Sequence, residues 1–205
     1  IMNQTTYNVL LIYLILAFMI YTLYLLYQSR LILKIYFAKK AIKKLEKETD
    51  FFNEEALYQT IQETFETLQE AAVDQRVDIA KKYMTPECFD EWQMKVNWTV
   101  MKQGYILSHD TTLTKIAIVS IQANLDKHDS FWVYIEGYHD HQPFIYNDES
   151  KKEEHLKTKG YYASIEDNTF QEFWEFIRIN DQFYLNTMVP RKQFNLHKLK
   201  NKINL

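Results

Sequence analysis

The residues best suited to chemistry in this sequence form the run His139-Asp140-His141. Two imidazoles and a carboxylate can coordinate a metal ion, and a histidine can act as a general base near neutral pH. On a β-strand, however, the two histidines would point to one side and the aspartate to the other. Pro143 follows closely, which indicates a strand that ends in solvent. We therefore predict no metal in this run, and for the whole chain we predict no catalytic residue, no cofactor and no metal.

A second group of charged residues is interleaved with aromatic residues between Phe170 and Met188. Alternating segments on either side of a polar turn are typical of a β-hairpin. Strand alternation gives two faces: Trp174, Phe176 and Arg178 on one, and Phe173, Glu175 and Ile177 on the other. We interpret Arg178 with Glu172 or Glu175 as a structural ion pair rather than a catalytic one. The hairpin then either closes a cavity or forms the wall of a core.

The chain of 205 residues contains one cysteine, Cys88. It can therefore build neither a disulfide framework nor a cysteine-based metal site within itself, and a reducing compartment is favoured. Cys88 falls at the start of a predicted helix and has no evident histidine partner. We expect it to serve in packing.

Three helices are predicted before any strand of the domain. The first is entered through Asn53, the second covers residues 78–84, and the third begins at Thr85-Pro86-Glu87 and stops near Gly104. The residues expected on their buried faces are Leu57, Ile61, Phe65, Leu68 and Ala72 in the first helix, and Phe89, Trp92, Val96 and Val100 in the third.

Strands are predicted after Gly104, over residues 113–125, 130–139 and 160–165 and in both arms of the hairpin. The charged stretch 147–159 between them is expected to be an exposed insertion. Helices followed by an antiparallel meander predict an α+β domain, with helices packed on one face of a curved antiparallel sheet.

A transmembrane helix is expected before this domain. Residues 9–27, VLLIYLILAFMIYTLYLLY, carry no charge, and as a helix they would cover about 28 Å, close to the thickness of a bilayer core. A cleaved signal peptide and a buried core helix are the alternatives.

Seven basic residues, from Arg30 to Lys47, follow the apolar run and none precedes it, which favours a C-terminal domain on the matrix or cytoplasmic side. Tyr13, Tyr21 and Tyr24 inside the run favour contact with other transmembrane helices.

Charge is unevenly distributed along the chain. Net charge is +4 over residues 1–50, −12 over residues 51–190 and +5 over residues 191–205. We accordingly divide the chain into a transmembrane helix (1–29), a basic juxtamembrane helix or linker (30–50), the α+β domain (51–190) and a basic C-terminal tail (191–205). Anionic lipid head groups are expected partners of Lys39, Lys40, Lys43 and Lys44. The acidic domain argues against DNA as a partner, whereas the tail could contact RNA, lipid or an acidic protein.

The segment 51–189 resembles the Tim-forty-four-like domain, the tethering subunit of the mitochondrial protein-import motor and its relatives. Three stretches carry the likeness: TIQETFETLQEAAVDQRVDIAKKYMTPECF, the strand Trp174-x-Phe176-x-Arg178, and Phe183-x-Leu185 followed by Met188. Phe183 stands where the family usually has tryptophan. The resemblance implies a nuclear-transport-factor-two-like cone, a fold whose members serve different functions.

These observations predict a non-enzymatic, single-pass scaffold or accessory subunit of a large assembly in the mitochondrial inner membrane, such as a respiratory-chain or ATP-synthase complex. The 15 Tyr and 13 Phe against 3 Gly and 3 Pro indicate AT-rich codons, and the initial Ile1 fits an organelle gene. A bacterial plasma-membrane protein is the alternative localisation. The alternative functions are a tether of the import motor or of the mitochondrial ribosome, and a small enzyme or ligand-binding cone.

Overall fold

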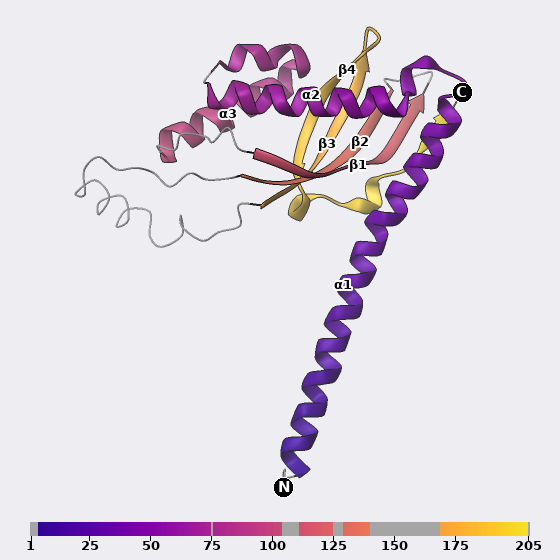
Figure 1. The fold of residues 1–205 in the computed structure, drawn as a ribbon, viewed down its shortest axis with the longest axis vertical. Helices are drawn as coiled ribbons and strands as arrows, with labels where there is room; N and C mark the ends of the chain where they lie inside the picture. The colour runs from indigo at the N-terminus through magenta and orange to yellow at the C-terminus, as the bar shows by residue number, and fades with distance from the viewer. Residues whose placement is uncertain (1–3, 75, 104–110, 125–128, 140–168, 205) are drawn as a thin grey trace, which may run out of the picture.

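The computed structural model describes residues 4–74, 76–103, 111–124, 129–139 and 169–204. Helix α1 (Gln4–Leu45) leads to helix α2 (Glu54–Val73) and helix α3 (Pro86–Gln103), which precede a five-stranded sheet. The first half of α1 projects away from the rest of the molecule, and its second half lies along one edge of the sheet (Figure 1).

The second half of α1 is an integral part of the folded domain. Its buried residues are Leu31, Ala38, Ala41, Ile42 and Leu45, which recur at helical spacing on one face. This face contacts strand β1 (Thr111–Asn124). Leu33 and Phe37 lie on the side of the helix turned away from the sheet and are about half exposed.

The prediction of an N-terminal transmembrane helix over residues 9–27 is wrong. In the described part of the chain, no helix combines the length and the apolar character that a membrane crossing requires. The uncharged run is the first half of a 42-residue helix that changes to basic residues at Arg30 and continues onto the sheet.

Helices α2 and α3 begin where their capping residues predict. The Asn53 side chain accepts a hydrogen bond from the Ala56 N–H at the start of α2. Thr85 precedes Pro86 at the start of α3, and its hydroxyl accepts the Cys88 N–H at 3.4 Å. The buried face of α2 contains Leu57, Ile61, Phe65 and Leu68 as predicted, but it ends with Ala71 in place of Ala72.

Two short 3₁₀ helices, η1 (Asp50–Phe52) and η2 (Val77–Tyr83), complete the helical layer. The second of them replaces the helix predicted over residues 78–84. In α3, Phe89, Trp92 and Val96 are buried as predicted, whereas the Val100 side chain lies outside the described residues.

The sheet has the strand order β4-β3-β2-β1-β5, and this architecture is consistent with the predicted α+β class. Strands β1, β2 (Ser130–His139), β3 (Thr169–Ile179) and β4 (Gln182–Pro190) pair antiparallel.

The hairpin between β3 and β4 turns at Asn180 and Asp181, whose φ angles are +47° and +67°. Asparagine and aspartate tolerate this left-handed region better than most side chains, so the turn forms where the polar residues interrupt the aromatic ones. Residues 147–159 and 160–165, with their predicted insertion and strand, lie outside the described residues.

The larger core lies between the sheet and helices α2 and α3. Phe131, Trp174 and Phe176 are buried there, and the Phe131 and Phe176 rings stack with their centroids 4.9 Å apart. Phe65 of α2 packs on Trp174, with the two centroids 6.0 Å apart. The hairpin is therefore a wall of this core.

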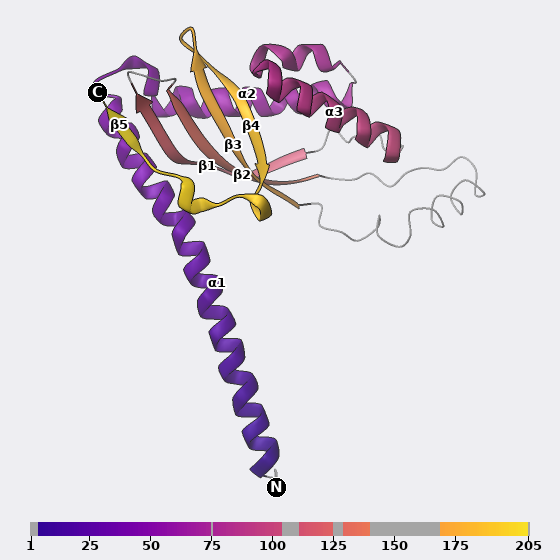
Figure 2. The ribbon, with the colours of Figure 1, turned by 180° about the vertical axis from the view of Figure 1, so that it is seen from behind.

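The opposite face of the sheet is covered by the C-terminal segment. After β4, the chain forms two 3₁₀ turns, η4 (Arg191–Gln193) and η5 (Leu196–Lys198), and ends in strand β5 (Lys202–Asn204), which pairs parallel with β1. Figure 2 shows this yellow segment running along the sheet to α1. Leu196 and Leu199 are buried against Val119, Tyr134 and Phe173, so these residues, predicted as a basic tail, form a second core.

Candidate functional site

The predicted metal candidate lies largely outside the described part of the chain. Strand β2 ends at His139, while Asp140 and His141 belong to the range 140–168 that the structure does not describe. Among the described residues, no three His, Cys, Asp or Glu side chains come together to hold a metal ion.

Arg178 does not pair with Glu172 or Glu175, its predicted partners, but with two aspartates. Its guanidinium contacts Asp129 at 2.5 Å and Asp181 at 3.2 Å, and it lies over the Phe51 ring, 4.1 Å from the centroid. Glu172 is six residues away along the strand, about 20 Å, and Glu175 points to the opposite face of the sheet. Distance therefore keeps Glu172 out of reach, and the pleat of the strand keeps Glu175 out of reach.

Both glutamates have structural partners of their own. Glu172 accepts the indole N–H of Trp174 at 2.7 Å, and Glu175 accepts the side-chain amide of Asn186 at 2.9 Å. Asn186 is the extra residue of a bulge in β4, and it also lies 3.3 Å from the Thr85 hydroxyl at the start of α3. Glu172 is therefore bonded within β3, and Glu175 links β3 to β4 within the hairpin.

Cys88 is suited to packing and poorly suited to nucleophilic chemistry. Cys88 lies in the first turn of α3 with its side chain buried, and burial, with Glu91 nearby, raises the pKa of the thiol to about 12. A thiol with so high a pKa remains protonated at neutral pH, whereas a nucleophilic cysteine must ionise.

A small cavity of about 170 Å³ lies between the helices and the hairpin. Its walls are mainly apolar, and its polar groups include Lys95 and Glu172, of which Glu172 is held by Trp174. The cavity lies beside Phe65 and Trp174, two aromatic residues of the larger core.

A partly buried polar network fixes the start of the C-terminal segment. The Tyr134 hydroxyl donates to Glu136 at 2.8 Å, and Arg191 donates to the Tyr134 hydroxyl and to Gln171, both at 3.0 Å. Burial and the hydrogen bond to Glu136 raise the pKa of Tyr134 to about 12. The network keeps the chain against the sheet as it leaves β4.

Among the described residues, the most extensive exposed apolar surface is that of α1. From Val9 to Leu26, fifteen large apolar side chains are each between 46% and 68% exposed. The surface continues on the outer side of the second half of the helix, through Ile32, Leu33, Tyr36 and Phe37. We call these residues of α1 the docking surface. It ends at the four lysines predicted to contact lipid, all exposed, of which Lys39 lies 3.4 Å from Glu54.

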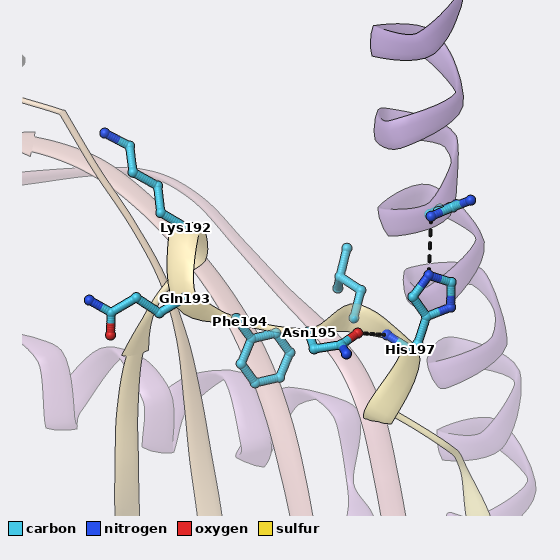
Figure 3. A pocket seen from close by; sticks show the side chains of 7 residues that line it. Lys192, Gln193, Phe194, Asn195 and His197 are labelled. Atoms are coloured by element: carbon cyan, nitrogen blue, oxygen red, sulfur yellow. Dashed lines mark hydrogen bonds between the residues drawn. The ribbon is translucent and has the colours of Figure 1, made fainter.

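An open pocket of about 250 Å³ lies where the C-terminal segment crosses α1. We call it the basal pocket; it is lined by Arg30 of α1 and by residues 192–197 (Figure 3). Arg30 lies 3.1 Å from the ring nitrogen Nε2 of His197, and the Asn195 side chain accepts the His197 N–H at 3.0 Å. The basic character of residues 191–205 is one sign of this pocket in the sequence. The contact with Arg30 could not be predicted, because Arg30 is 167 residues from His197.

No protein-family model, curated protein or solved structure matches this chain. The resemblance to Tim-forty-four-like domains therefore rests on the three sequence stretches alone.

Proposed function

We propose that this protein is a non-enzymatic accessory subunit that joins a larger protein assembly through α1. The single observation that carries the proposal is the docking surface. A helix that is apolar on all sides is normally covered, and contiguous exposed apolar patches of this kind mark interaction sites. Full burial of one such side chain contributes about 1.5–3 kcal/mol, so a partner gains substantially by covering several of them.

The chemistry of the docking surface defines the partner that would fit it. Apolar residues cover the outer side of α1 as far as Phe37, and lysines follow at residues 39–47. We propose apolar helices of neighbouring subunits as the partner, with acidic side chains where they meet the lysines. Opposite charges at the end of an apolar contact fix its register.

The interior of the domain supports a structural role. Arg178 pairs with Asp129 just before β2, and Glu175 links β3 to β4 through Asn186. Glu172 is bonded to Trp174 within β3, so all three charged residues of the hairpin have structural partners. The mitochondrial respiratory-chain or ATP-synthase assembly, and the alternative import-motor or ribosome tether, stay predictions.

A pair of matched substitutions tests the proposal. Phe18 on α1 and Met94 on α3 are both 67% exposed, so neither contributes much to the core. We expect Phe18→Glu, expressed in the native host, to release the protein from its assembly on native electrophoresis, with Leu14→Glu acting alike. Met94→Glu should leave the assembly intact. Equal behaviour of the Phe18 and Met94 variants would refute docking through α1.

A further inference from the structure

The first half of α1 carries two tyrosine hydroxyls that no described residue of the chain binds. Tyr13 and Tyr21 are 67% and 57% exposed, and neither makes a hydrogen bond within the described part of the chain. By contrast, the hydroxyls of Thr22 and Ser29 each donate to a backbone carbonyl of the helix itself, at 2.8 Å. A tyrosine hydroxyl that is covered without a hydrogen bond is costly. A partner on this side of α1 must therefore offer hydrogen bonds at two levels.

The two tyrosines are placed symmetrically about Ala17. Each lies four residues from Ala17, so the three residues form one row on the helix, with the tyrosines about 12 Å apart along its axis. Ala17 is exposed, has the smallest side chain between Val9 and Leu26, and lies in the middle of this apolar run. The row reads the same in both directions from its centre, which is the property that a two-fold symmetric interface requires.

We propose that a second copy of this chain covers this side of α1, as an antiparallel pair of first halves with its two-fold axis beside Ala17. Tyr13 then lies at the level of Tyr21 of the second copy, and the reverse. Because a hydroxyl both donates and accepts, each such pair of tyrosines can form its own hydrogen bond. The pairing rests on the proposed function, since it uses one side of the docking surface, and it leaves the other sides to neighbouring subunits.

The area of the apolar run fits such a pair. An unfolded residue exposes roughly 1.45 Å² per dalton, so the fifteen residues from Val9 to Leu26 offer roughly 1,500 Å² at their observed exposures. A single helix lying alongside covers one side, about half of this area, and each partner in a stable interface contributes about 800 Å². One side of the run is therefore sufficient for a stable dimer.

The lysines of α1 favour the antiparallel arrangement. Lys39 follows Ala17 by 22 residues, which is about 33 Å along the helix. Parallel helices would place the lysines of both copies side by side, whereas antiparallel helices place them at opposite ends, well beyond the screening distance of about 10 Å. In Figures 1 and 2, no described element lies beside the first half of α1, so a second helix has room there.

Cross-linking of introduced cysteines on the purified full chain tests the pair. All variants carry Cys88→Ala, so the introduced thiol is the only one. With a short bis-maleimide, we expect Ala17→Cys to give a covalent dimer and Ile15→Cys to give at least tenfold less, because Ile15 lies on the opposite side of the helix. Equal cross-linking of these two variants, or no cross-linking of Ala17→Cys, would overturn the proposal.

A mixing experiment tests the direction of the two helices. Tyr13→Cys and Tyr21→Cys chains should cross-link when they are mixed, and at least fivefold less when each is alone, because antiparallel helices bring position 13 to position 21. Self-linking of each variant at the level of the mixture would mean that the helices are parallel and would contradict the pair.

Removal of the hydroxyls tests the chemistry of the contact. We expect Tyr13→Phe with Tyr21→Phe to weaken dimerisation at least tenfold by sedimentation equilibrium. Tyr36→Phe removes a hydroxyl from a residue of α1 that is 61% exposed and lies beyond the paired segment, and it should change dimerisation less than twofold. Equal effects of the two variants would refute the tyrosine pairing. A chain that is monomeric in isolation but assembles in its native host would refute the pair and leave the accessory role standing.

Discussion

At the scale of single residues, Trp174 connects the aromatic pattern of the hairpin to the stability of the domain. Its side chain is 3% exposed, packs on Phe65 and donates its indole N–H to Glu172. We expect Trp174→Ala to lower the free energy of unfolding by about 3–5 kcal/mol, measured by chemical denaturation. Trp174→Phe retains most of the packing and should cost about 1–2 kcal/mol, mainly for the lost hydrogen bond. Two equal losses would mean that ring packing at this position contributes little.

Cys88 gives a prediction about pH at the same scale. Its pKa is raised from an ordinary value of 9.0 to about 12 in the folded protein, so between these values the unfolded chain loses a proton that the folded chain keeps. This contribution to stability is complete below pH 9 and is lost as pH rises toward 12. Cys88→Ala should therefore make stability less sensitive to pH in this window. The native thiol should also resist labelling at pH 8 and react readily in denaturant; fast native labelling would show that the site is open.

At the scale of elements, the C-terminal segment behaves as a part of the core. Leu196 and Leu199 are buried on the second face of the sheet, where each contributes about 1.5–3 kcal/mol, and the partly buried Phe194 adds to this contribution. Together they account for a large part of the stability of an ordinary domain. We expect deletion of residues 194–205 to abolish cooperative thermal unfolding followed by circular dichroism.

A charge-only control accompanies this deletion. Lys198→Gln with Lys200→Gln changes exposed side chains of the same segment and should alter stability by less than about 0.5 kcal/mol. A deleted chain that unfolds as cooperatively as the full one would contradict the assignment of this segment to the core.

The elements also show what could be predicted from the sequence. The hairpin and the starts of α2 and α3 depend on local signals: alternation, a polar turn, and the capping residues Asn53 and Thr85. Strand β5 is three residues long and pairs with β1, about 80 positions earlier in the chain. No local sequence pattern therefore predicts this strand. The contact between Arg178 and Asp129 likewise depends on strand pairing across a sequence gap, which composition and periodicity do not encode.

At the scale of the whole molecule, α1 serves two purposes along one continuous helix. In its second half, Ile42 and Leu45 pack in the core against the sheet. Arg30 and Lys34 form hydrogen bonds with the C-terminal segment. Its first half carries most of the docking surface away from the domain (Figure 1). The domain therefore holds the docking surface in a defined direction, as an accessory subunit with a fixed place among neighbours requires.

The size and composition of the native particle test this account most directly. We expect the protein, isolated from its own source under mild conditions and analysed by native mass spectrometry, to be found in a complex with other polypeptides at fixed stoichiometry. Because the contact through α1 is apolar, the complex should persist when the salt concentration is raised, whereas association through exposed charges would weaken. Recovery of the native protein only as a monomer, at low as well as high salt, would contradict the account.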